Sequence, residues 1–102
     1  MARFRYKLQN ILEIKMKMET QARQQFAQAR RELDLALAYL AELKEKKERL
    51  EQEAIELLTG DLDFHDIDDN QLSRIFCDQQ IAAQEAVVAK AEERLEQARQ
   101  LL

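Results

Sequence analysis

The residues best suited to chemistry gather beside the only glycine of the chain, Gly60. The segment Asp61-Leu62-Asp63-Phe64-His65-Asp66 alternates carboxylates in the manner of a calcium loop. Such a loop needs a glycine at its sixth position and a glutamate at its twelfth, whereas these positions hold Asp66 and Leu72 here. We therefore expect that this segment binds no metal.

The two remaining reactive side chains, His65 and Cys77, also indicate a protein that is not an enzyme. His65 is the only histidine, and a single histidine in a polar corner is more often a solvated side chain than a base or a ligand. Cys77 lies on a periodic apolar stripe with no histidine near it in sequence, so we expect it to pack as a small apolar residue. No glycine-rich loop is present to bind phosphate. We expect no enzyme activity, no catalytic residue and no cofactor.

The composition is typical of long helices. The 102 residues include no proline, 35% charged residues and only 6% aromatic residues, as in coiled coils. The net charge of −4 disfavours general binding to nucleic acids, which depends on clustered cations. No apolar run approaches the ~20 residues that span a bilayer, and the single cysteine excludes an intramolecular disulfide. The sequence predicts a cytoplasmic chain.

The first part of the chain predicts one long helix from about residue 2 to residue 58. Its apolar stripe steps by threes and fours, which is the rhythm of a coiled coil. The rhythm slips once, between Met18 and Phe26, where two steps of four follow one another. The stripe comprises Phe4, Leu8, Ile11, Lys15, Met18, Ala22, Phe26, Ala29, Leu33, Ala36, Leu40, Leu43, Lys47, Leu50, Ala54 and Leu57.

A corner at residues 59–63 is predicted to join this helix to a second one over about residues 64–102. Gly60 favours the end of the first helix because glycine adopts the left-handed conformation at low cost. The second helix starts after Asp63 or at Asp68–Asn70, and we favour Asp63. The connection is short, so the helices must run antiparallel. The predicted fold is all-α, a single long two-helix antiparallel coiled-coil hairpin over residues 1–102.

The second helix carries one apolar stripe and a further row of apolar residues. The stripe repeats every seven residues and contains small side chains that allow close helix packing: Cys77, Ile81, Gln84, Val88, Ala91, Leu95, Ala98 and Leu102. Leu72, Phe76 and Ala83 lie on the side away from it, flanked by Ile75 and Val87 and interrupted by Gln79. We favour a partner-docking patch for this row. The alternative is a seam that widens near the corner and partly buries it.

The two predicted helices differ in length. Folded back, the second helix ends near the level of Ala22, leaving the apolar side chains of Phe4, Leu8, Ile11, Leu12, Ile14 and Met18 without a partner in the chain. Either the natural chain continues past Leu102 or another molecule covers them. We favour the first, a C-terminally shortened version of a longer protein.

The charges are segregated along this rod. Residues 1–18 carry Arg3, Arg5, Lys7, Lys15 and Lys17 against Glu13 alone, whereas the corner carries Asp61, Asp63, Asp66, Asp68 and Asp69. One basic end and one acidic end favour directional steering of a partner. The simpler interpretation of the aspartates is that they solvate the corner and stabilise the start of the second helix.

The opening segment FRYKLQNILEIKMKMET resembles the flagellar export protein FliJ family. The family pattern of two aromatic residues followed by Leu-Gln-x-x-Leu is matched by Phe4, Tyr6, Leu8, Gln9 and Leu12. The likeness extends over essentially the whole chain, although family members are usually some tens of residues longer.

This resemblance implies a non-enzymatic component of the flagellar type III export apparatus, similar to the central stalk of rotary ATPases. The implied partners are a hexameric export ATPase, the cytoplasmic domain of the membrane export gate, and export chaperones, at the cytoplasmic face of the inner membrane. The implied contacts to the ATPase ring are Arg3, Phe4, Arg5, Tyr6, Lys7, Leu8 and Ile11. Those to the gate are Leu72, Ile75, Phe76, Gln79 and Ala83. The alternative functions are a structural coiled-coil tether or a stalk from another rotary ATPase, and a nucleic-acid-binding hairpin is disfavoured by the acidic corner.

Overall fold

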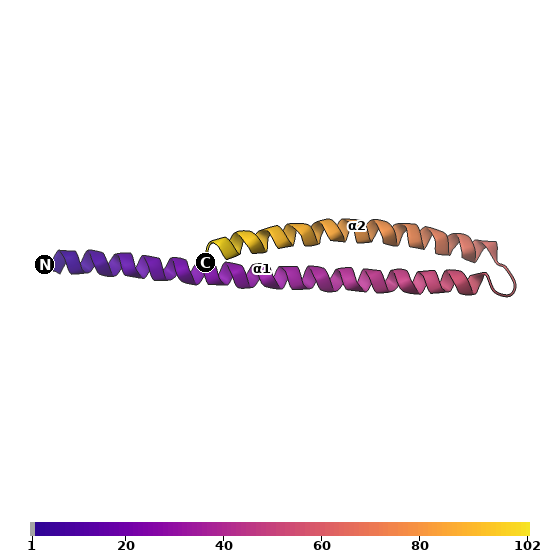
Figure 1. Cartoon of the computed structure of the whole chain (residues 1–102), viewed down its shortest axis with the longest axis horizontal. Helices are drawn as coiled ribbons and strands as arrows, with labels where there is room; N and C mark the ends of the chain where they lie inside the picture. The colour runs from indigo at the N-terminus through magenta and orange to yellow at the C-terminus, as the bar shows by residue number, and fades with distance from the viewer. Residues whose placement is uncertain (1) are drawn as a thin grey trace.

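The structure, a computed structural model, describes residues 2–102 and consists there of two long α-helices joined by a tight corner. Helix α1 spans Ala2–Leu57 and helix α2 spans Phe64–Gln100. Figure 1 shows that α2 folds back along α1 and stops well before the N-terminal end of α1. The molecule measures 92 × 16 × 15 Å. The prediction of an all-α antiparallel hairpin is confirmed.

The corner forms because the last turn of α1 tightens and one residue then adopts a left-handed conformation. The amides of Leu58 and Thr59 donate to the carbonyls three residues earlier, at 3.1 Å each. Gly60 follows with φ of +86°. A Cβ atom at this position would meet nothing within 4 Å, so the requirement for glycine comes from the backbone conformation alone.

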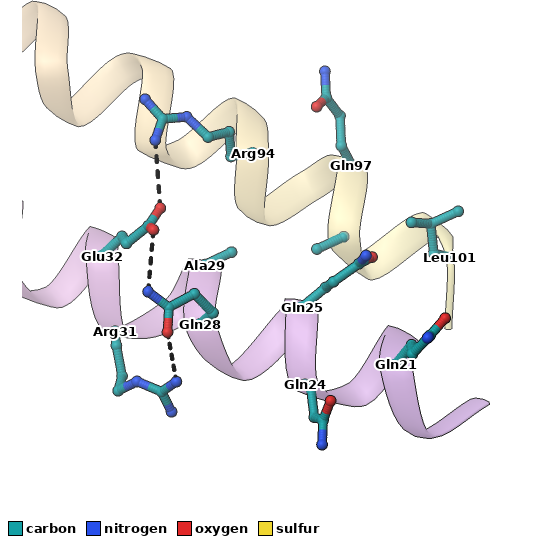
Figure 2. A pocket seen from close by; sticks show the side chains of 11 residues that line it. Gln21, Gln24, Gln25, Gln28, Ala29, Arg31, Glu32, Arg94, Gln97 and Leu101 are labelled. Atoms are coloured by element: carbon teal, nitrogen blue, oxygen red, sulfur yellow. Dashed lines mark hydrogen bonds and ion pairs between the residues drawn. The ribbon is translucent and has the colours of Figure 1, made fainter. Parts of the chain in front are cut away.

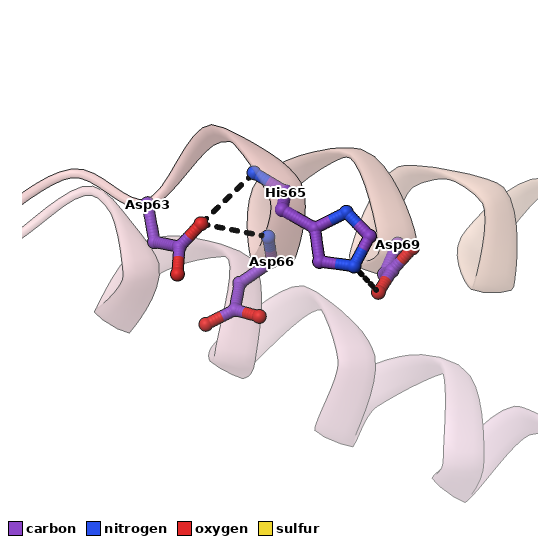
Figure 3. Close-up of polar contacts among 4 residues, drawn as sticks. All are labelled: Asp63, His65, Asp66 and Asp69. Atoms are coloured by element: carbon purple, nitrogen blue, oxygen red, sulfur yellow. Dashed lines mark hydrogen bonds and ion pairs between the residues drawn. The ribbon is translucent and has the colours of Figure 1, made fainter.

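Asp63 begins α2 by capping it. Its Oδ1 accepts hydrogen bonds from the amides of His65, at 3.0 Å, and Asp66, at 3.4 Å (Figure 3). These amides have no acceptor within the helix, so the carboxylate satisfies them. His65 Nε2 lies 3.5 Å from Asp69 Oδ2, one turn further along. Within residues 2–102, no group of three or more His, Cys, Asp or Glu side chains is arranged to hold a metal ion.

The two helices share one continuous seam. Every stripe residue predicted from Ala22 to Leu57 is buried or half-buried, and so is every one predicted from Cys77 to Ala98. A central cluster of Ala36, Leu40 and Val88 packs with Leu33 and Ile81. The alanines on both helices keep the side chains of the seam short, which favours close approach of the two backbones.

Leu102 is the exception, and its predicted place on the seam is wrong. The amides of Leu101 and Leu102 bond to the carbonyls of Ala98 and Arg99, at 3.2 and 3.1 Å. These bonds span three residues instead of four, so the chain leaves the α-helical path after Gln100. The side chain of Leu102 consequently leaves the seven-residue repeat and is 64% exposed.

Candidate docking surfaces

The first candidate surface is the part of α1 that α2 does not reach. We call residues 2–21 the N-terminal overhang, because every one of these residues is exposed. All residues that the family resemblance assigns to the ATPase ring lie on it: Arg3, Phe4, Arg5, Tyr6, Lys7, Leu8 and Ile11. The structure therefore brings them onto one projecting helix, and their role as a ring contact stays a prediction.

The overhang combines an apolar stripe with positive charge. The side chains of Phe4, Leu8, Ile11, Leu12, Ile14 and Met18 are between 45% and 66% exposed. The cationic side chains of the same segment are Arg3, Arg5, Lys7, Lys15 and Lys17. A helix with this surface is suited to an apolar groove that has carboxylates at its rim.

A groove opens where α2 ends, and glutamine is the most frequent residue in its lining (Figure 2). Beside it, a chain of polar contacts links the two helices. Arg94 Nη1 of α2 donates to Glu32 Oε2 of α1 at 3.4 Å. Glu32 Oε1 accepts from Gln28 Nε2 at 3.2 Å, and Gln28 Oε1 accepts from Arg31 at 2.6 Å. These contacts show that the side of α2 that carries Arg94 adjoins the side of α1 that carries Glu32.

The second candidate surface lies on the outside of α2. Leu72 and Phe76 are 66% and 57% exposed, and Ile75, Gln79 and Ala83 are exposed as well. The seam does not widen near the corner to cover them. Their contact with a partner stays a prediction, and their exposure leaves them available for it.

The Arg94–Glu32 contact shows that this surface extends onto α1. Phe76 lies 18 residues before Arg94, which is five helical turns and hence the same side of α2. On α1, Tyr39 lies one heptad after Glu32 and therefore faces the same side of the hairpin. Six exposed side chains consequently lie on one side, since Leu72 is only about 40° from Phe76, and we call them the apolar flank: Leu35, Tyr39, Leu72, Phe76, Ala83 and Val87.

Sequence reasoning missed the contribution of α1 to this flank. Leu35 and Tyr39 are 73% and 45% exposed, but their position beside Phe76 depends on how the helices face one another. Ile75, in contrast, diverges from Phe76 by about 100° because the two are neighbours on a helix. It lies on another side of α2 and does not extend the apolar flank.

The side of the hairpin away from Arg94 carries an ion pair between the helices. Lys47 Nζ lies 2.9 Å from Asp78 Oδ1. The hydrogen bond to this carboxylate and its charge raise the pKa of Lys47 above its usual value. Both side chains are substantially exposed, so the pair is screened by salt and contributes little to stability. Polar contacts therefore border the seam on both sides.

These features define an extended helical hairpin that carries separate exposed surfaces along its length. A model of the flagellar FliJ protein family matches residues 4–102. The chain therefore belongs to this family, as the opening motif predicted, and is a component of the flagellar export apparatus. Searches of curated proteins and of solved structures gave no match. Neither helix described over residues 2–102 is long and apolar enough to cross a bilayer.

Proposed function

We propose that this chain is a stalk that engages the hexameric export ATPase and links it to the cytoplasmic domain of the membrane export gate. The observation that carries the proposal is the separation of two exposed surfaces on one rod. The N-terminal overhang projects from one end, and the apolar flank lies along the paired helices. Such a rod connects two partners by shape and contact and needs no catalytic chemistry of its own.

The overhang is the proposed contact to the ATPase ring. Its cations supply long-range attraction to an acidic rim, and its apolar stripe supplies the surface that desolvates on binding. A single amphipathic helix gains stability when a partner covers such a face. Engagement by the ring would thus bury the same residues that the hairpin leaves exposed.

The apolar flank is the proposed contact to the gate. A contiguous apolar surface that includes aromatic side chains is typical of interfaces, and Phe76 and Tyr39 supply the aromatic side chains here. Family membership further supports export chaperones as partners, and a place at the cytoplasmic face of the inner membrane at the flagellar base. On this proposal the chain is held at the membrane by protein contacts alone.

A structural tether is the second candidate function. The uncovered apolar stripe of the overhang favours it, because two such stripes from different molecules can cover each other. The net positive charge of the overhang opposes this pairing, since like charges would then lie side by side. The tether predicts self-association through residues 2–21, whereas the stalk predicts a monomer that binds an ATPase.

The rate of the cognate hexameric export ATPase, measured at low salt with and without the chain, tests the stalk. We expect the chain to stimulate ATP hydrolysis. The variant Arg3→Glu/Arg5→Glu/Lys7→Glu should lose most of this stimulation, because the steering charge of the overhang is reversed. Sedimentation of the same samples measures self-association.

The matched control is Lys44→Glu/Lys46→Glu/Arg49→Glu, which makes the same charge change on exposed residues of the paired part of α1. This control should stimulate like the unchanged chain. Equal loss in both variants would mean that total charge matters and not the overhang. An absence of stimulation by a folded chain that dimerises through residues 2–21 would favour the tether.

A further inference from the structure

Three polar side chains on the seam of α2 bond to the backbone of α1. Asn70 Nδ2 donates to the carbonyl of Leu50 at 3.0 Å, and Gln84 Nε2 donates to that of Ala36 at 3.0 Å. Between them, Cys77 Sγ lies 3.5 Å from the carbonyl of Leu43. Asn70 and Cys77 are 4% and 0% exposed. We call this set of three contacts the polar ladder.

The polar ladder follows the heptad repeat on both helices. Its donors are spaced by seven residues along α2, and its acceptors are spaced by seven in the opposite direction along α1. If the same steps continue, Ala91 faces Ala29 and Ala98 faces Ala22. The seam is thus divided into a half near the corner with polar contacts and a half near the end of α2 with paired alanines.

We propose that the polar ladder selects the register of the hairpin. A shift of one residue turns the amides of the buried Asn70 and the half-buried Gln84 away from the carbonyls and leaves them unpaired, which is costly in an apolar seam. A polar side chain at a buried heptad position is a known means of fixing register at some cost in stability. Purely apolar residues at these positions would tolerate several alignments.

Shifts by a whole heptad are also disfavoured. In one direction, Gln84 would face Leu43, whose side chain would occupy the space that Ala36 now leaves for this long amide; the shorter amide of Asn70, in contrast, reaches the carbonyl of Leu50 beside a leucine side chain. In the other direction, Ala98 would face Lys15 and place an ammonium group against the alanine half of the seam. The acceptor Ala36 carries only a methyl group, so its carbonyl stays open to the amide of Gln84.

The register decides which surface the hairpin presents. The apolar flank exists only when Phe76 and Val87 lie beside the part of α1 that carries Leu35 and Tyr39. This consequence for docking rests on the proposed function. The selection of register itself does not, and it is measured on the isolated chain without any partner.

The test uses spin labels on exposed positions that flank the groove at the end of α2, Gln25→Cys and Gln97→Cys, in a Cys77→Ser background that keeps a small donor. Double electron–electron resonance should give a single distance between the two labels in the protein whose polar ladder is intact. The variant Asn70→Leu/Gln84→Leu should retain its helix content and its melting temperature. It should add a second distance population, displaced along the axis by about 10 Å for a heptad at 1.5 Å per residue.

Gln71→Leu/Glu85→Leu is the matched control, because it places the same residues at the same spacing on exposed positions of α2. It should keep the single distance. The smaller variant Asn70→Ala/Gln84→Ala repeats the test without added bulk. A single distance in folded ladder variants would overturn the proposal and assign the register to the corner. Loss of helix in both would also overturn it, since the ladder would then hold the helices together without selecting their alignment.

Discussion

The N-terminal overhang and the paired part of α1 have similar sequence patterns and opposite environments. Both carry an apolar stripe that steps by threes and fours. Leu40 and Leu43 are 9% and 5% exposed, whereas Phe4 and Ile11 are 66% and 60% exposed. The paired part has α2 against it, and the overhang projects alone (Figure 1).

This difference shows what a heptad pattern specifies. The pattern places apolar side chains on one side of a helix, but it contains no information on what covers that side. In the paired part the cover is another segment of the same chain. We propose that a partner protein covers the apolar side of the overhang.

The largest expected effect separates the two regions by stability. Leu43→Ala should lower the free energy of unfolding by about 2–4 kcal/mol, because it leaves a cavity in the seam. Ile11→Ala, on the overhang, should change it by less than about 0.5 kcal/mol. Urea unfolding followed by circular dichroism measures both. Similar losses in the two variants would show that something covers the overhang in the isolated protein.

The next effect separates inward from outward apolar residues within the paired part. Phe76→Ala should leave stability within about 0.5 kcal/mol of the unchanged chain. It should weaken binding to the cytoplasmic domain of the export gate by about tenfold, or ~1.4 kcal/mol. Phe64→Ala is the control, since Phe64 is 73% exposed near the corner and lies outside the apolar flank. Isothermal titration calorimetry should find the affinity of Phe64→Ala for the gate domain unchanged. A comparable loss of affinity in this control would show that the apolar flank is not a specific contact.

The smallest effect concerns the corner that closes the paired part. Asp63→Ala should lower the free energy of unfolding by about 1 kcal/mol, because two amides at the start of α2 lose their acceptor. Asp61→Ala removes the same charge from the corner without removing the cap, and it should have little effect. Equal melting temperatures for the two variants would mean that the carboxylate of Asp63 acts through its charge only.

Much of the fold follows from the periodicity and from Gly60. The seam residues from Ala22 to Leu57 and from Cys77 to Ala98 were predictable, because burial follows the spacing of apolar side chains. Leu102 was not, since the final turn changes its hydrogen bonding. Asn70 was also missed on the seam. A buried asparagine interrupts the apolar pattern, and its burial is explained by two hydrogen bonds, one donated to the carbonyl of Leu50 and one accepted from Arg74 Nε.

The candidate surfaces were predictable to different degrees. The overhang follows from the unequal lengths of the helices and from the opening motif. The row containing Phe76 follows from one helical wheel. The addition of Leu35 and Tyr39 does not, because a wheel describes one helix and not the rotation of its neighbour. The Arg94–Glu32 contact in the structure shows how α1 is rotated relative to α2.

The polar ladder makes the two helices unequally sensitive to mutation. Its donors are side chains of α2, whereas its acceptors are backbone carbonyls of α1. A substitution at position 36, 43 or 50 changes the side chain and leaves the carbonyl in place. A single substitution at position 70 or 84 removes a donor outright. In a mutational scan, α1 would therefore respond at these levels to side-chain size, and α2 would respond to hydrogen-bonding chemistry.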